Sequence, residues 1–276
     1  MLVSSPVHLR VGTYNVENMF DDVNDPHKDD DDMEPKSERS LQVVADTLRR
    51  VDADVVALQE VENVEVLQEF LDEHLPGMYP NVVLVEGNDN RGIDVAFISK
   101  HPITRVESHK EDRFPVPNQN SPGFFKRDLL EVSVQLPEGP TVDLYAAHLK
   151  SHGGGQSADD QRLGEASQIR NVLREDYRED PDRFRIVMGD MNDTPPTPTI
   201  RAMLTPGEGQ VKDSLGDKPF KERDTHPAGA PRRSIDFILY SDNLKEEFQE
   251  ARVHRFPEAR QGSDHYMVSA DFLLTA

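Results

Sequence analysis

Short apolar runs, rich in Val, Ile, Leu and Ala and often ending in Asn, Asp, Glu or His, recur along this chain of 276 residues. Runs of this length that are bounded by turn-forming residues are typical of buried β-strands. They alternate first with segments of helical periodicity and later with links short enough for hairpins, an order that favours mixed sheets covered by helices. We therefore expect strands at His8–Val16, Asp54–Gln59, Asn81–Glu86, Gly92–Ser99, Leu129–Gln135, Thr141–His148, Phe184–Gly189, Ser234–Tyr240 and Tyr266–Leu273.

Helices are expected between these strands, at Ser37–Val51, Asn63–His74 and Asp159–Glu175. In the first of them, apolar residues recur every three or four positions, and Ser37 has the side chain of a good N-cap. Long polar loops are expected at Asp21–Lys36, which contains an acidic run, and at Asp112–Arg127 and Thr205–Arg233. We find no repeat of fixed period and interpret residues 1–276 as one α/β domain.

The formal net charge is −21, from 52 acidic and 31 basic residues. This excess argues against indiscriminate binding to a nucleic-acid backbone, which relies on Lys and Arg. It does not exclude a nuclease, because a metal ion and a few local Arg side chains can reverse the field inside a cleft. By itself the acidic surface indicates solubility.

Several classes of protein are disfavoured by what the sequence lacks. It has no cysteine, so disulfides and cysteine metal sites are excluded. It has no run approaching the roughly 20 apolar residues of a membrane span. The N-terminus has no basic segment followed by an apolar stretch. We therefore expect a cytoplasmic monomer, although a mature secreted form would show the same N-terminus.

Polar side chains gather at the ends of the expected strands. Side chains alternate between the faces of a strand, so Asn15 and Glu17 are expected to point the same way. Glu60 follows the second buried strand, and His148 and Lys150 share one face at the end of a later one. Taken singly, Glu60 and His148 are each more often a structural residue than a functional one.

The C-terminal half shows the same pattern. Asp190 and Asn192, two residues apart, should face one side and can position a water and a phosphate oxygen together. Asp236 lies within an apolar strand, where burial of its carboxylate is costly without a partner. The pair Asp264-His265 precedes the last strand.

These clusters resemble, in order, the motifs of the endonuclease/exonuclease/phosphatase superfamily, a group of metal-dependent phosphoesterases. The resemblance covers nearly the whole chain and rests on the segments Thr13-Tyr14-Asn15-Val16-Glu17, Leu58-Gln59-Glu60-Val61, His148-Leu149-Lys150-Ser151, Gly189-Asp190-Met191-Asn192, Ile235-Asp236-Phe237-Ile238-Leu239 and Ser263-Asp264-His265. It implies a four-layer αββα sandwich, in which two mixed β-sheets pack face to face with helices outside. The active site is then expected at one edge of the paired sheets.

The resemblance also implies a metal site. Hard oxygen ligands suit Mg²⁺ or Mn²⁺, with Ca²⁺ as a further candidate, and magnesium usually takes only one or two carboxylates. Glu60 is the first choice as ligand, and Asp264 and Glu17 are expected to join it or to hold a second ion.

The expected catalytic groups surround the scissile phosphate. Asp190 orients or deprotonates the attacking water, with Asn192 beside it. His265 faces the phosphate and is held in one tautomer by Asp236, and His148 is a second donor. Whether Asp190 or His265 is the general base is left open by the motifs.

Asn15, Lys150 and Arg91 are expected to bind the phosphate oxygens. For Lys150 and Arg91 a role as plain solvated cations is equally compatible with the sequence.

The function expected is divalent-metal-dependent hydrolysis of phosphodiester bonds, with DNA or RNA as the partner. The segment Phe124-Phe125-Lys126-Arg127 offers rings and cations that suit a nucleic-acid strand, although packing of both rings in the core or a loop is the favoured reading. A phosphomonoesterase or a small-molecule or phospholipid-headgroup phosphodiesterase remains an alternative, and the absence of Trp speaks against membrane docking. An inactive binding module is the alternative from another class.

Overall fold

The apolar runs of the sequence form two mixed β-sheets of six strands each in a computed structural model, which describes residues 5–30 and 33–275. The first sheet has the order β11-β12-β1-β2-β4-β3. Its strands are β1 (Val7–Met19), β2 (Val55–Val61), β3 (Asn81–Leu84), β4 (Asp94–Ser99), β11 (Phe248–Val253) and β12 (Val268–Leu274). Only β1 and β2 pair in parallel in this sheet.

The second sheet has the order β5-β6-β7-β8-β10-β9. Its strands are β5 (Ile103–Ser108), β6 (Leu130–Gln135), β7 (Thr141–His148), β8 (Phe184–Asp190), β9 (Val211–Asp213) and β10 (Asp236–Ser241). Here β7 and β8 form the parallel pair. Each sheet therefore has a parallel pair at its centre, and the carboxyl ends of these strands carry the polar residues singled out above.

The three predicted helices flank the sheets, and two short helices that were not predicted accompany them. The predicted helices are α1 (Glu38–Val51), α2 (Val64–His74) and α3 (Gln156–Glu179), the two others are α4 (Pro198–Met203) and α5 (Phe220–Arg223), and the 3₁₀ turns are η1 (Asp242–Leu244) and η2 (Ala259–Gln261). The N-cap expected at Ser37 is confirmed, because its side chain accepts a hydrogen bond from the backbone N–H of Ser40. No helix among the described residues combines the length and apolarity needed to cross a membrane.

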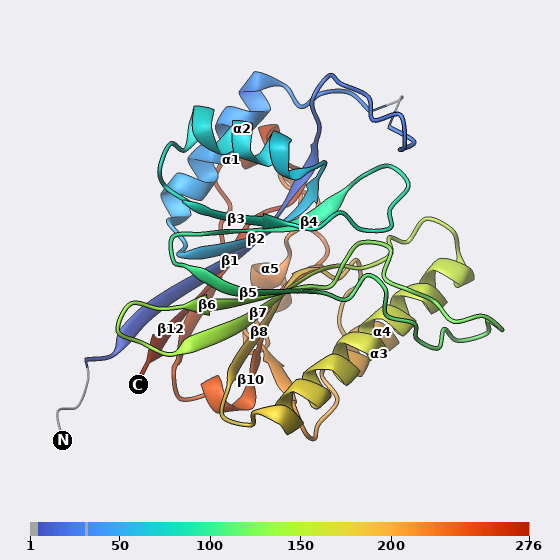
Figure 1. Cartoon of the computed structure of the whole chain (residues 1–276), viewed down its shortest axis with the longest axis vertical. Helices are drawn as coiled ribbons and strands as arrows, with labels where there is room; N and C mark the ends of the chain where they lie inside the picture. Colours follow the sequence, from blue (N-terminus) through green and yellow to red (C-terminus); the bar gives the residue numbers. More distant parts are fainter. Residues whose placement is uncertain (1–4, 31–32, 276) are drawn as a thin grey trace.

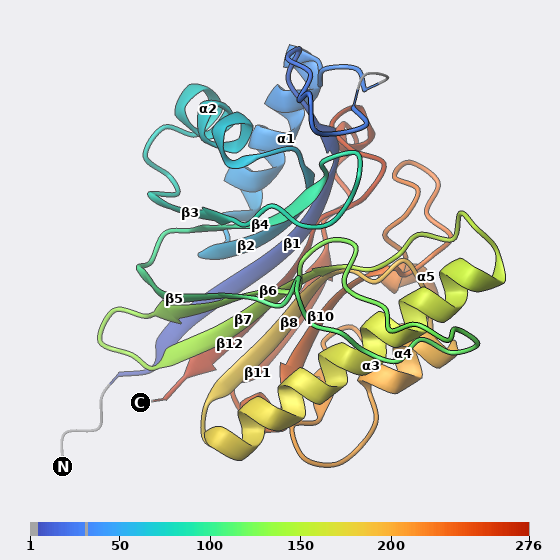
Figure 2. The same ribbon diagram turned by 45° about the vertical axis from the view of Figure 1, so that its right-hand side comes forward.

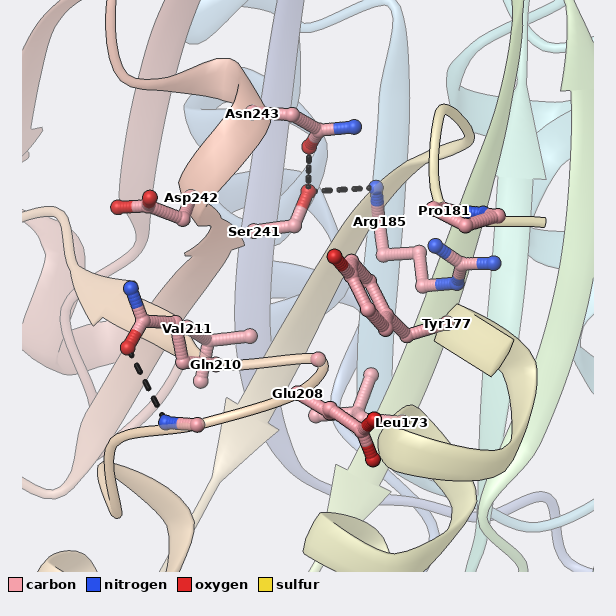
Figure 3. A pocket seen from close by; sticks show the side chains of 12 residues that line it. Leu173, Tyr177, Pro181, Arg185, Glu208, Gln210, Val211, Ser241, Asp242 and Asn243 are labelled. Atoms are coloured by element: carbon pink, nitrogen blue, oxygen red, sulfur yellow. Dashed lines mark hydrogen bonds between the residues drawn. The ribbon is translucent and has the colours of Figure 1, made fainter. Parts of the chain in front are cut away.

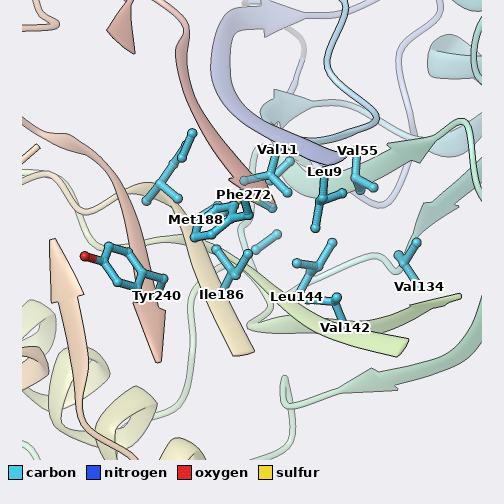
Figure 4. Packing of buried hydrophobic residues seen from close by; sticks show 14 of the residues in the cluster. Leu9, Val11, Val55, Val134, Val142, Leu144, Ile186, Met188, Tyr240 and Phe272 are labelled. Carbon is cyan, nitrogen blue, oxygen red and sulfur yellow. The ribbon is translucent and has the colours of Figure 1, made fainter. Parts of the chain in front are cut away.

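Three apolar clusters define four layers. The central one fills the space between the two sheets and includes Val11 and Val55 from the first sheet and Leu144, Ile186 and Met188 from the second (Figure 4). A second cluster joins the outer face of the first sheet to α1 and α2, and a third joins the outer face of the second sheet to α3 and α4. Figures 1 and 2 show these helices on opposite outer sides. The predicted αββα sandwich is confirmed.

The elements that the sequence did not predict lie mainly at sheet edges. β5 is mostly exposed and β11 mostly half-buried, so they lack the apolar alternation of a buried strand. The short β9 and α5 lie inside the segment predicted as the loop Thr205–Arg233. Two acidic residues of the predicted loop Asp21–Lys36, Asp31 and Asp32, lie outside the described residues.

The strand registers bring the site together. Asp190 is paired with His148 across the parallel β7–β8 ladder and with Asp236 across the antiparallel β8–β10 ladder. The first residue of β10 therefore lies beside the last residues of β7 and β8. In the facing sheet, Asn15 is paired with Gln59 near the same ends of β1 and β2. One edge of the sandwich thus collects the ends of strands that are far apart in sequence.

Candidate active site

Asn15 links the two sheets at this edge. Its Nδ2 donates to Glu60 Oε1 and to Asp190 Oδ2, at 3.1 Å in both cases. Asn15 is almost fully buried, so these bonds satisfy an amide that would otherwise be costly to bury. The amide therefore fixes the carboxylate of one sheet relative to the carboxylate of the other.

The end of β1 is bulged, and this corrects the expectation that Asn15 and Glu17 follow simple alternation. The β1–β2 register shifts after Asn15, and Glu17 and Asn18 have left-handed backbone conformations. The backbone N–H of Glu17 donates to Asn15 Oδ1 at 3.0 Å, and that of Asn18 donates to Glu60 Oε2 at 3.0 Å. Glu60, which lies within β2 rather than after it, is also left-handed. Backbone strain of this kind clusters at functional sites.

His265 and Asp236 form the expected couple. His265 Nδ1 lies 2.9 Å and 3.0 Å from the two carboxylate oxygens of Asp236, and both side chains are buried. Burial acts to lower the pKa of His265, but the charges of Asp236 and Asp190 outweigh it and raise the pKa to about 10. His265 is therefore an imidazolium at neutral pH, with Nε2 directed to within 3.7 Å of Asp190 Oδ2.

Ser263 fixes this imidazolium against the first sheet. Its hydroxyl donates to the carbonyl oxygen of Asn15 at 2.7 Å and accepts from the backbone N–H of His265 at 3.0 Å. The turn before β12 is thereby tied to the end of β1.

Asp190 is a buried acid of the site. Burial and, to a lesser extent, the neighbouring Asp236 raise its pKa to about 7, against the opposing charge of His265. Its Oδ1 accepts the backbone N–H of Asn192 at 2.8 Å. Asp190 is therefore held in one rotamer, with a proton affinity suited to general base catalysis at neutral pH.

The remaining predicted catalytic residues have different surroundings. His148 Nε2 lies 3.7 Å from Asp190 Oδ2 and 3.9 Å from Glu60 Oε1. Burial, together with the charge of Arg127, holds the pKa of His148 well below its ordinary value, so the ring is neutral. Asn192 uses its side-chain amide to donate to the carbonyl oxygen of Leu149 at 3.0 Å, which fixes the segment after β7.

The predicted metal ligands concentrate negative charge. Burial raises the pKa of Glu17, and the nearby carboxylates of Asp264 and Glu60 raise it further. The Lys36 ammonium donates to the carbonyl oxygen of Glu17 at 2.8 Å and partly offsets this charge. In the described part of the chain, some groups of acidic and histidine side chains have potential ligand atoms that all lie within 4.8 Å of one another. Asp190–Asp236–His265 and His226–Asp264–His265 are two such groups, whereas Glu17, Glu60 and Asp264 do not form one. An ion with one direct carboxylate and several waters fits Glu60, as magnesium prefers.

A group of cationic side chains lies near His148. Arg91, Arg127 and Lys150 are all close enough to lower the pKa of that imidazole. Arg127 is buried, and its Nε lies 3.1 Å from Asp89 Oδ2. These residues place positive charge beside the site in a chain of strongly negative net charge.

Three residues outside the predicted site lie beside it. Lys36 and Arg127 end two of the predicted loops, Arg127 within the segment 124–127 considered for nucleic acid, and His226 lies inside the third loop. His226 is in contact with the ring of His265, at a centroid distance of 4.7 Å. No strand end marks these positions, so only their residue types could have drawn attention to them.

A cavity of about 450 Å³ lies away from these groups (Figure 3). It is lined by Leu173 and Tyr177 of α3, by Arg185 near the start of β8, and by the segments 207–211 and 241–243. Arg185 and Asp190 lie near opposite ends of β8, so this cavity is distinct from the acid and imidazole cluster.

Comparison with known proteins agrees with this geometry. The model of the "Endonuclease/Exonuclease/phosphatase family" matches residues 10–216. An endonuclease/exonuclease/phosphatase family protein from Bacteroides thetaiotaomicron has a similar structure, with a TM-score of 0.69, 18% identity and coverage of 98% of both chains. Truncated TDP2 from Caenorhabditis elegans has a TM-score of 0.63 and 18% identity, over 96% of this chain and 98% of that one.

The catalytic domain of human Nocturnin, solved with a bound sulfate anion, has a TM-score of 0.67 and 16% identity, over 98% of this chain and 95% of that one. Identities this low show a shared fold. No curated protein matches the sequence significantly.

Proposed function

Since the chain belongs to the endonuclease/exonuclease/phosphatase family, we propose that it hydrolyses phosphodiester bonds with a divalent metal ion and that its substrate is nucleic acid. The observation that carries this proposal is the convergence of Asn15, Glu60, His148, Asp190 and His265 from both sheets, each with a polar side-chain atom within 3.9 Å of another member of the group. Such a cluster offers a proton acceptor, donors to phosphate oxygens and a carboxylate for a cation.

Glu60 is the proposed direct ligand of Mg²⁺ or Mn²⁺, with Glu17 and Asp264 nearby. The mutual repulsion that raises the pKa of Glu17 supports this assignment, because a cation relieves it. When bound, the metal supplies positive charge to the phosphate oxygens. Asn15 and the backbone N–H of Asn18 keep both oxygens of Glu60 in place, so the ligand is oriented before the ion arrives.

Asp190 is proposed as the general base, which resolves the choice left open by the motifs. His265 is already protonated at neutral pH and therefore has no free lone pair for a water proton. Asp190 has a pKa of about 7 and an oxygen that faces both imidazoles. We assign His265 the role of stabilising charge on the phosphate, and Asp236 the role of keeping His265 protonated and oriented.

His148 is proposed as a neutral donor to the same phosphate. Its lowered pKa means that one ring nitrogen carries the only proton, so it donates without adding charge. Asn15 and Asn192 act beside it by holding Asp190, the first through its side chain and the second through its backbone.

The cations next to His148 favour a substrate that carries a second phosphate beside the scissile phosphodiester. Arg91, Arg127 and Lys150 are proposed to bind the phosphate that flanks the scissile bond. Phe124 adds a half-buried ring, with Lys126 Nζ 4.2 Å and Arg113 Cζ 4.9 Å from its centroid. Phe125, in contrast, is buried against Phe114 at a centroid distance of 5.0 Å and belongs to the core.

A substrate panel tests the proposal. Single- and double-stranded DNA, RNA, bis-p-nitrophenyl phosphate and p-nitrophenyl phosphate are each incubated with Mg²⁺ or Mn²⁺, with and without chelator. We expect turnover of the diesters and of at least one nucleic acid, and loss of it with chelator. Faster turnover of the monoester would instead favour a phosphomonoesterase, and no turnover of any ester would favour a binding module.

The pH dependence of the reaction is a separate prediction. Asp190 accepts a proton only when ionised, so kcat/KM for a diester should rise as pH passes through about 7 and then stay level while His265 keeps its proton, up to about 10. The profile is measured at saturating metal between about pH 5 and pH 9. An acid limb centred near 4, the ordinary range of an aspartate, would contradict the assignment of the base.

A further inference from the structure

The loop between α5 and β10 is fastened to the segment that carries Asp264 and His265. The backbone N–H of Ala228 donates to the carbonyl oxygen of Asp264 at 2.6 Å, and that of Tyr266 donates to the carbonyl oxygen of Thr225 at 2.9 Å. The backbone N–H of Gly229 donates to the Tyr266 hydroxyl at 2.8 Å. These bonds place His226, which lies between the anchored residues, beside Asp264.

Both ring nitrogens of His226 have partners. Nε2 lies 3.2 Å from Asp264 Oδ2, and Nδ1 lies 3.0 Å from a terminal nitrogen of Arg233. The His226 side chain is 17% exposed, and its bond to Asp264 is partly shielded from water, whereas its bond to Arg233 is exposed. Its ring also lies against that of His265, with an angle of 50° between the planes.

These partners select one tautomer. A guanidinium group can only donate, so Nδ1 of His226 must accept the bond from Arg233. The proton of the ring is then on Nε2, which donates to the carboxylate of Asp264. The ring thus connects the guanidinium of Arg233 to one oxygen of Asp264.

The other oxygen of Asp264 has a competing attraction. Oδ1 lies 3.7 Å from Nε2 of His265. A small rotation of the carboxylate would close this gap and form an ion pair with the imidazolium. That rotation would break the hydrogen bond between His226 and Asp264 Oδ2, so this bond opposes the rotation.

We propose that His226, oriented by Arg233, is a positioning residue that holds Asp264 in the rotamer in which it serves the metal site. This role of His226 and Arg233 rests on the proposal that Asp264 is a metal ligand. Groups that orient a metal ligand in this way typically change metal affinity or activity by about 10–100-fold when removed.

Metal binding is the first test, with Mn²⁺ as the probe and titration calorimetry as the readout. We expect His226→Ala to weaken Mn²⁺ binding by about 10–100-fold. His226→Gln should recover much of the affinity, because its amide can donate to Asp264 and accept from Arg233. Since His226 acts through Asp264, the double variant with Asp264→Ala should bind no more weakly than Asp264→Ala alone.

Nitrogen chemical shifts of the histidines in the metal-free protein provide the second test. We expect His226 to carry its proton on Nε2, and Arg233→Ala to produce a mixture of tautomers. Arg232→Ala is the matched control, because Arg232 meets His226 through its backbone N–H, which donates to the His226 carbonyl oxygen at 2.9 Å. This variant should leave the tautomer unchanged.

The outcomes separate the two proposals. Unchanged Mn²⁺ affinity in His226→Ala, additive losses in the double variant, or a proton on Nδ1 would each overturn the role of His226. A wild-type protein that binds no Mn²⁺ would overturn it as well. Weakened Mn²⁺ binding in His226→Ala, together with a wild-type protein that cleaves no phosphoester, would sustain the positioning role and refute the proposed function.

Discussion

Asp190→Asn is expected to lower kcat/KM for a phosphodiester by about 10²–10⁴-fold, which is the usual contribution of a positioned general base. Asparagine keeps the size of the side chain but cannot accept a proton from water. The melting temperature should stay near that of the wild type. The substitution removes one of the two hydrogen bonds that Asp190 accepts from Asn15 and Asn192, which lowers stability. It also removes the free-energy cost of burying a carboxylate, which offsets that loss.

Asp143→Asn is the matched control. Asp143 is also a buried aspartate at the ladder between β7 and β8, but it lies near the start of β7, where its Oδ1 accepts from the Ser133 hydroxyl at 2.6 Å. Its replacement should leave kcat/KM unchanged. Near wild-type turnover by Asp190→Asn would show that another group is the base.

Gly189→Ala is expected to destabilise the protein by about 4 kcal/mol or more, a range reached only by mechanisms such as overpacking of a rigid core. A Cβ at this position would overlap the carbonyl oxygen of Ala147 on the neighbouring strand, and backbone cannot move aside as a flexible side chain can. The loss would be a large part of the total stability of a typical domain. Chemical denaturation, or the yield of soluble protein, measures it.

Gly77→Ala provides the control for this substitution. Gly77 also has a positive φ, but a Cβ there meets no atom within 4 Å, so only the backbone penalty of roughly 1–2 kcal/mol applies. Equal effects of the two substitutions would contradict the close approach of β7 and β8. That approach matters for function because it places His148 beside Asp190.

The strand-end residues of the site could be predicted from the sequence for a physical reason. Asn15, Glu60, His148 and Asp190 each come at the end of an apolar run, and parallel neighbours bring such ends to one edge of a sheet. The run itself is recognisable because burial demands apolar side chains. The motifs then indicated that the two edges face each other, which periodicity alone could not show.

The residues that the sequence did not reveal depend on loop paths. Arg127 and His226 reach the site from segments whose course is set by packing against the rest of the fold, as the hydrogen bonds between residues 225–229 and the turn before β12 illustrate. The bulge at Glu17 and Asn18 likewise arises from bonds to Asn15 and Glu60 that form only in the folded state. β5 and β11 escaped prediction because partial exposure to solvent interrupts their apolar pattern.

The acidity of the chain is compatible with an anionic substrate because the charge is unevenly distributed. Arg91, Arg127 and Lys150 act on the neutral His148, and His265 is protonated, so some positive charge lies beside the proposed phosphate site in a chain of net charge −21. We expect affinity for nucleic acid to fall only modestly with salt, because a few phosphate contacts release few counterions and salt also screens the general repulsion.

The dependence of bis-p-nitrophenyl phosphate turnover on Mg²⁺ concentration, compared between the wild type and Glu60→Gln, tests the central claim most directly. Glutamine can preserve the bonds to Asn15 and Asn18 through its oxygen only in part, and it removes the charge that would hold the ion. We predict saturable, chelator-sensitive turnover in the wild type and none above background in a folded Glu60→Gln protein. Equal turnover by both proteins, or wild-type turnover that persists in chelator, would contradict a metal-dependent phosphodiesterase built on Glu60.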